Sequence, residues 1–94
     1  MQITFQFEAQ LSQVAGTRQQ NVELPTGATV LSAIQHVAQD GSSALRERIL
    51  NEDGSVQRSL MVFVNELPVP ASETATRVLQ DRDTVLFLPP ISGG

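Results

Sequence analysis

The 94-residue sequence has a net charge of −4 at pH 7, 40% hydrophobic residues, one histidine and no cysteine. A chain of this length forms one domain with a modest core, and the composition excludes disulfides, a cysteine nucleophile and thiolate metal sites, so we expect no metal site. The acidic balance argues against a nucleic-acid partner, and no apolar stretch or leader pattern indicates a membrane partner, so we expect a cytoplasmic location.

The first quarter of the chain predicts two strands. Residues 3–9 (ITFQFEA) and residues 20–25 (QNVELP) alternate between apolar and polar side chains, which is typical of half-buried strands. The side chains expected to face the core are Ile3, Phe5, Phe7, Ala9, Val22 and Leu24. With a loop around residues 15–17 between them, the two strands predict a hairpin.

The middle of the chain changes to a helical period. Apolar residues between positions 30 and 38 recur at helical spacing, with Thr29 as N-cap and Gly41 as stop. This pattern predicts an amphipathic helix of about three turns with one face on the sheet. Residues 43–50 predict a short second helix, and residues 51–54 a turn that leads into a surface loop.

Two apolar strands follow, at residues 60–64 (LMVFV) and 84–88 (TVLFL), the second ended by Pro89. The elements expected between them are a turn at Asn65-Glu66, a short edge strand at residues 67–70, a helical turn that buries Val78 and Leu79, and a tight turn at residues 81–83. The order predicts an α+β fold, with one main helix on one face of a mixed sheet of four to five strands.

The late strands are apolar on both alternate sets, although a sheet with one wet face is expected to alternate. Some of these side chains are therefore expected to face outward. Either the loop at residues 42–59 covers them or a partner docks on them. The candidate partner-binding residues are Met61, Phe63, Leu86, Phe87 and Leu88.

The sequence ends in LFLPPISGG, residues 86–94. Pro89 and Pro90 favour an extended geometry, and the last two residues, lacking Cβ atoms, fit a slot too narrow for side chains. A glycine pair also occurs at frayed ends and in cloning remnants, so the setting carries the interpretation. We expect residues 1–90 to form the domain and residues 91–94 a flexible tail that presents the carboxylate of Gly94. The tail residues are Pro89, Pro90, Ile91, Ser92, Gly93 and Gly94.

The opening hairpin, the helix, VFVNE, a D-x-D turn and LFLPPISGG together resemble the ubiquitin-like sulfur carriers. This family includes the molybdopterin-synthase small subunit (MoaD) and the thiamine sulfur carrier (ThiS). The resemblance spans essentially the whole chain and implies the β-grasp fold. It also implies a carrier protein rather than an enzyme, with no bound cofactor. An adenylating, E1-like enzyme would use ATP to join AMP to Gly94, and a sulfur donor would displace AMP to leave a thiocarboxylate for an acceptor enzyme.

Several destinations for the sulfur stay open. The F-x-P-P-x-x-G-G ending resembles the molybdopterin branch, whose acceptor is the large subunit of molybdopterin synthase. Residues 43–66 resemble an insertion in carriers of cysteine biosynthesis, whose acceptor is a pyridoxal-phosphate (PLP) enzyme, a cysteine synthase. Thiamine synthesis and tRNA thiolation use the same chemistry. As a protein modifier, Gly94 would instead be joined to lysines of targets, although this chain has no lysine on which to build polymers of itself.

The chain departs from the family pattern at two turns. Family members often have Asp-Gly-Asp before the last strand and Asn-Gly after the third. Here the residues are Asp81-Arg82-Asp83 and Asn65-Glu66. If these turns need a left-handed backbone, a side chain there costs about 1–2 kcal/mol relative to glycine.

Overall fold

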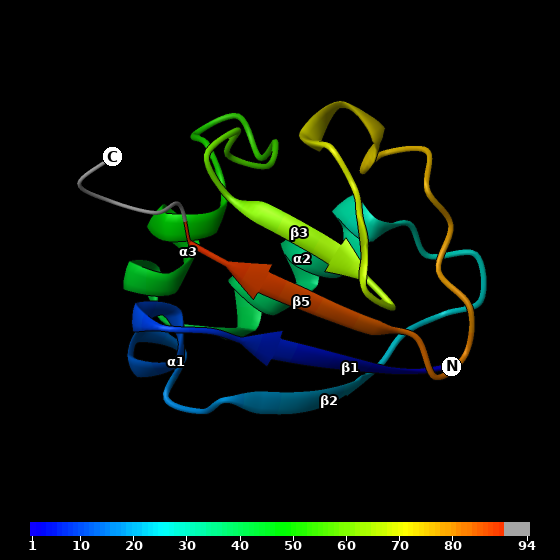
Figure 1. The fold of residues 1–94 in the computed structure, drawn as a ribbon, viewed down its shortest axis with the longest axis horizontal. Helices are drawn as coiled ribbons and strands as arrows, with labels where there is room; N and C mark the ends of the chain where they lie inside the picture. The colour runs from blue at the N-terminus through cyan, green and yellow to red at the C-terminus, as the bar shows by residue number, and fades with distance from the viewer. Residues whose placement is uncertain (90–94) are drawn as a thin grey trace.

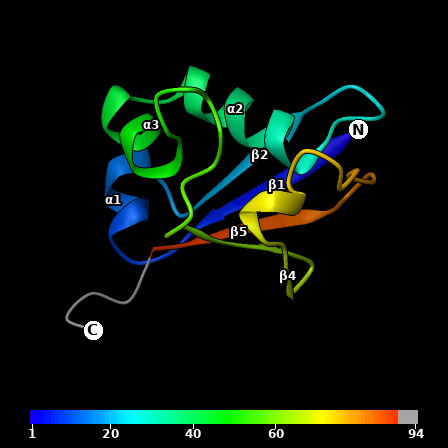
Figure 2. The same cartoon turned by 90° about the horizontal axis from the view of Figure 1, so that it is seen from above.

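The computed structural model describes residues 1–89. The predictions for the tail concern residues outside this range, namely Pro90, Ile91, Ser92, Gly93 and Gly94. The described part is a five-stranded mixed sheet with helices on one face (Figures 1 and 2). Its elements are β1 (Gln2–Phe7), α1 (Gln10–Ala15), β2 (Gln19–Glu23), α2 (Val30–Asp40), α3 (Ser43–Ile49), β3 (Met61–Val64), β4 (Leu67–Pro68), the 3₁₀ helix η1 (Ala71–Glu73) and β5 (Thr84–Leu88). The predicted α+β architecture is confirmed.

The strand order is β2-β1-β5-β3-β4, so the last strand lies in the middle of the sheet. β1 pairs antiparallel with β2 and parallel with β5, and β5 pairs antiparallel with β3. Because β1 and β5 run the same way, β5 ends beside the end of β1, where the Glu8 N–H donates to the Phe87 carbonyl oxygen at 3.1 Å. Both flanks of β5 are therefore occupied up to the point where the chain leaves the sheet.

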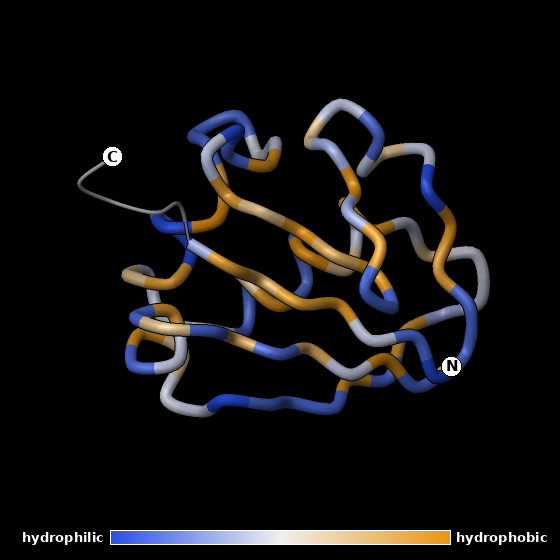
Figure 3. Tube along the Cα trace, in the orientation of Figure 1, coloured by the Kyte–Doolittle hydropathy of each residue, from blue (hydrophilic) through white to orange (hydrophobic). Residues whose placement is uncertain are grey.

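The core lies between the sheet and the helices. Helix α2 lies over one face of the sheet (Figure 2). One alternate set of side chains from each central strand and an apolar stripe of α2 face the core. The buried side chains are Ile3, Phe5 and Phe7 of β1, Val62 and Val64 of β3, Val85 and Phe87 of β5, and Val30, Ala33, Ile34, Val37 and Ala38 of α2. Figure 3 shows β3 and β5 as apolar along their length, whereas β2 is mostly polar.

Helix α2 begins and ends where the sequence predicts. The Thr29 side chain accepts from the Ser32 N–H at 3.1 Å, and the Ser32 side chain accepts from the Thr29 N–H at 2.8 Å. This reciprocal capping box satisfies two backbone donors that the first turn leaves free. At the other end, Gly41 donates its N–H to the Val37 carbonyl oxygen.

The expectation that Ala9 continues the first strand toward the core is wrong. β1 ends at Phe7, and Ala9 is exposed with a φ of 52°. A tight turn forms here, because the Leu11 N–H donates to the Glu8 carbonyl oxygen. The connection of the hairpin then contains helix α1, which the sequence did not predict because its six residues bury only Leu11.

The helical turn expected around Val78 is also wrong. The 3₁₀ helix lies earlier, at Ala71–Glu73, and Val78 is 51% exposed, whereas Leu79 is buried as predicted. Val78 forms an isolated antiparallel bridge with Thr29, and the Leu79 N–H donates to the Ala28 carbonyl oxygen at 2.9 Å. In such an extended backbone, neighbouring side chains point to opposite sides, so only one of the two is buried.

Candidate functional site

An apolar strip lies on the sheet face opposite the helices. Met61 of β3 is paired with Leu88 of β5, and Phe63 is paired with Leu86. Met61 is 43% exposed, and the other three side chains are partly buried. We call these four residues the outer strip; all four are among the candidates that the sequence singled out.

Phe87, the fifth candidate, does not belong to the outer strip. Its side chain is 0% exposed, and its ring lies 5.8 Å from that of Phe5 and 5.6 Å from that of Phe7, measured between centroids. The prediction that Phe87 lies on a docking surface is therefore wrong. The pairing of Phe87 with Phe7 places both rings on the helix side of the sheet.

The segment at residues 42–59 does not cover the outer strip. It packs on the helix side, where the Gln35 side-chain amide of α2 donates to the Gly54 carbonyl oxygen at 2.8 Å. Within the segment, the Gln57 side-chain amide donates to the Leu50 carbonyl oxygen, and Leu50 forms a bridge with Val56. The alternative in which this loop folds over the outer face is wrong.

A groove of about 400 Å³ continues the outer strip toward the sheet edge. It lies where β4 ends after two residues and the chain turns away through Pro68 and Pro70. Met61 and Phe63 line it together with Arg58. The position of Arg58 beside the outer strip depends on tertiary structure alone.

Polar groups of β1 border the strip on its other side. Gln6 is paired with Leu86, and the parallel register carries Glu8 to the level of Leu88. The outer strip is thus flanked by an arginine on one side and by an amide and a carboxylate on the other. An apolar centre with a polar rim is the usual anatomy of a protein–protein interface.

Pro89 is the last described residue and marks the base of the tail. It follows directly on β5, which is held between β1 and β3. Pro89 lines a cavity of about 200 Å³ together with Arg48, Gln10 and Ser59. Tail base here means Pro89 and these three residues. The five residues that follow reach at most about 17 Å from Pro89.

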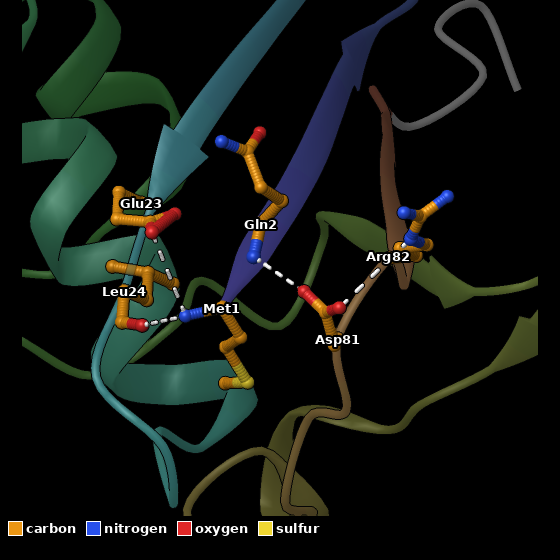
Figure 4. Close-up of polar contacts among 6 residues, drawn as sticks. All are labelled: Met1, Gln2, Glu23, Leu24, Asp81 and Arg82. Carbon is orange, nitrogen blue, oxygen red and sulfur yellow. Dashed lines mark hydrogen bonds and ion pairs between the residues drawn. The ribbon is translucent and has the colours of Figure 1, made fainter.

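The opposite end of β5 is fastened to the start of β1 (Figure 4). The Asp81 carboxylate accepts from the Gln2 N–H at 2.7 Å, and the Arg82 N–H donates to the Gln2 carbonyl oxygen at 2.7 Å. The Met1 amino group donates to the Leu24 carbonyl oxygen at 2.6 Å. The two contacts of Gln2 hold the register of β5 against β1, and the Met1 contact holds β1 against β2.

Both turns that lack the family glycine keep a left-handed backbone. Arg82 has a φ of 72°, and in the two-residue turn between β3 and β4 Asn65 and Glu66 have φ values of 49° and 72°. Asp83 ties the two turns together, since its carboxylate accepts from the Asn65 side-chain amide at 2.7 Å. Both turns therefore have the left-handed backbone in which a side chain costs more than glycine.

Within residues 1–89, no three His, Cys, Asp or Glu side chains are grouped closely enough to hold a metal ion. His36 lies 3.3 Å from Asp40 on the exposed side of α2. Hydrogen bonds from the Ser55 hydroxyl, and then from its backbone N–H, lower the pKa of Asp53 in an exposed turn.

Within residues 1–89, no helix has the length and apolar character needed to cross a bilayer.

The sequence matches the model of the ThiS family over residues 5–94. Among solved structures, SAMP1 from Haloferax volcanii is similar with a TM-score of 0.87 and 26% identity, covering 100% of both chains. The Amycolatopsis orientalis BexX/CysO complex contains a chain with a TM-score of 0.73 and 29% identity, covering 98% of this chain and 99% of that chain.

A putative molybdopterin converting factor subunit 1 from Pyrococcus furiosus has a TM-score of 0.77 at 24% identity, with 97% of this chain and 99% of that chain covered. At that identity the likeness shows the fold alone. A search of curated proteins gave no significant match.

Proposed function

Because the chain belongs to the ThiS family, we propose that it is a sulfur carrier whose working group is the carboxylate of Gly94. The observation that carries the proposal is the family match, which begins within β1 and runs on to residue 94. In this role the chain is a co-substrate or a non-catalytic small subunit rather than an enzyme.

The chemistry proceeds in two balanced steps. In the first, a Gly94 carboxylate oxygen attacks the α-phosphorus of ATP in an E1-like adenylating enzyme, and pyrophosphate leaves. In the second, hydrosulfide supplied by a sulfur donor attacks the acyl carbon, the bond to AMP breaks, and AMP and a proton leave a thiocarboxylate on Gly94. A carboxylate is ionised at neutral pH, but its acyl carbon reacts only after such activation.

The structure supports this proposal through the placement of the tail base. Central strand β5 ends at Leu88, flanked by β1 and β3, so Pro89 has a fixed position. The outer strip lies on the same strands next to this point. Because the last five residues span at most about 17 Å, a partner that docks on Met61, Phe63, Leu86 and Leu88 would need its active site within about that distance of Pro89 to meet Gly94.

Intact-mass spectrometry tests the proposal directly. After incubation with a cognate adenylating enzyme, ATP and a sulfur donor, replacement of one oxygen by sulfur is expected to add about 16 Da. A variant that lacks Gly94 should show no such shift. If the full-length chain is also unmodified while the enzyme charges another carrier in the same tube, the proposed function is wrong.

A pair of surface variants tests the docking role of the outer strip. Leu88→Ser is expected to weaken binding to the adenylating enzyme, because it removes an apolar contact from the centre of the interface. Val78→Ser is the matched control, since Val78 is also exposed and apolar but lies outside the strip. Equal affinities of the two variants, measured by calorimetry, would contradict the docking role.

We propose molybdopterin synthesis as the destination of the sulfur, on the strength of the F-x-P-P-x-x-G-G ending. Cysteine biosynthesis is the second candidate, because residues 43–66, which include α3 and the loop beside α2, resemble the insertion of those carriers. Copurification distinguishes them. The first predicts recovery of a molybdopterin-synthase large subunit, and the second recovery of a PLP-dependent cysteine synthase.

A protein-modifier role is a further candidate, favoured by the similarity to SAMP1, the small archaeal modifier protein 1 of H. volcanii. It predicts isopeptide-linked conjugates that survive denaturing gels and disappear when Gly94 is removed. The two roles share the adenylation step and differ in whether sulfur or a target amine receives the acyl group.

A further inference from the structure

The cations of this chain are all of one kind. Six positive side chains are present and every one is arginine, although lysine is among the commonest residues of ordinary proteins. Cysteine is absent as well. Amines and thiols are the side-chain groups that attack an activated acyl carbon readily, whereas a guanidinium stays protonated and does not.

An activated Gly94 would be exposed to such attack. This argument rests on the proposed function. In an acyl adenylate or a thioester, an amine nitrogen that attacks the acyl carbon forms an amide, and AMP or the thiol leaves with the proton of the amine. The carrier would then be lost as a ring closed on itself or as a dimer.

The remaining amine is the α-amino group of Met1, which is engaged in hydrogen bonding within the fold. The group donates to the Leu24 carbonyl oxygen at 2.6 Å and lies 3.9 Å from the Glu23 carboxylate (Figure 4). In return, the Leu24 N–H donates to the Met1 carbonyl oxygen at 2.8 Å. Met1 is therefore a paired residue of the β1–β2 ladder, and attack by its nitrogen requires this pairing to open.

The distance between Met1 and the tail base adds a second barrier. β1 and β5 are parallel with Phe7 paired to Phe87, so Met1 and Pro89 are separated by the length of about eight strand residues. At roughly 3.3 Å per residue this is about 26 Å, beyond the roughly 17 Å that five extended residues can reach. Attack within one chain is therefore out of range.

Positive charge, in contrast, lies at the tail base and beside the outer strip. Arg48 lines the same cavity as Pro89, and Arg58 lines the groove beside the outer strip. A lysine at either place would supply the same charge together with a nucleophilic amine. Arginine supplies the charge alone.

We infer that the fold protects an activated Gly94 from its own chain, through arginine in place of lysine at the tail base and a distant, paired α-amino group. Positive charge is thereby kept at the tail base without a competing acceptor. An acyl group on Gly94 then waits for the sulfur donor or partner rather than closing on itself.

The test uses a chemical thioester on Gly94, made by intein thiolysis, so that no activating enzyme is needed. Wild type, Arg48→Lys, Arg58→Lys and Arg82→Lys are compared at pH 8 in amine-free buffer. Arg82→Lys is the matched control because Arg82 lies at the opposite end of β5, beside Gln2. Intact mass separates hydrolysis from amide formation, which leaves a product one water lighter than the acid, and peptide mapping locates the bond.

The wild type is expected to hydrolyse without internal amide, and Arg82→Lys to form only a trace of it. Arg48→Lys and Arg58→Lys are expected to form at least about tenfold more internal amide than Arg82→Lys, because an amine held near the acyl carbon has a high effective concentration. Equal amide yields in the three variants would overturn the inference, as would acylation of Met1 in the wild type. These outcomes are independent of the mass shift with ATP and sulfur donor, so a failure of the proposed function is recognised separately.

Discussion

Replacing Phe87 by alanine should strongly destabilise the domain, while replacing its neighbour Leu86 should not. Phe87 is 0% exposed and its ring contacts those of Phe5 and Phe7, so truncation leaves a cavity at the centre of the core. Such changes cost about 3–5 kcal/mol, with about 0.5–1.5 kcal/mol more for each aromatic pair. A domain of this size has about 5–15 kcal/mol in total, so the substitution removes a large share of its stability.

Urea denaturation followed by circular dichroism measures this difference. Leu86→Ala is the matched control, since Leu86 is on the same strand but on the partly exposed outer strip. It is expected to cost about 1 kcal/mol or less, because part of its surface is already in water. A loss below about 2 kcal/mol for Phe87→Ala, or an equal loss for both variants, would refute the assignment of the two faces.

Three further changes probe the turns. Arg82→Gly is expected to raise the free energy of unfolding by about 0.5–1 kcal/mol. Glycine removes the steric strain of a side chain in the left-handed region, and this gain outweighs the added entropy of the unfolded chain. A lower urea midpoint would contradict this. Asp83→Ala is expected to lower the free energy of unfolding by about 2–4 kcal/mol, because the hydrogen bonds that the buried carboxylate accepts from Asn65 and the Gln80 N–H are lost. An unchanged urea midpoint would show that this carboxylate does not stabilise the turns. Ser55→Ala is expected to raise the pKa of Asp53 toward its ordinary 3.8 in a carboxyl NMR titration. Because the folded pKa lies below that value, the stabilisation from this contact is present above about pH 4 and is lost as the pH falls.

Much of the fold was predictable from local pattern. β1, β2 and α2 each have one polar face, and their buried residues are those that the alternation or helical spacing indicated, apart from Ala9, which is exposed, and Leu31, which is only partly buried. Thr29 and Gly41 cap α2 as the sequence predicts. Helix α1 was missed because six residues with one buried side chain give too short a pattern.

The candidate site was predictable only in part. The sequence placed Met61, Phe63, Leu86 and Leu88 among the candidates, and the structure groups these four on one face. It did not predict that Arg58 lines the groove beside them or that Arg48 lies at the tail base. Both contacts join residues from different elements, so no local pattern reports them.

By itself, the sequence determined that the two late strands are apolar on both alternate sets and that the chain ends in a glycine pair. Only the tertiary structure decided that Phe87 faces the helices while Leu86 and Leu88 face outward. In a strand with one polar set of side chains, the residues themselves show which face is buried. In a strand that is apolar on both sets, they do not. Its orientation is set by the pairing of β5 with β1, between residues about 80 positions apart, and by packing against α2.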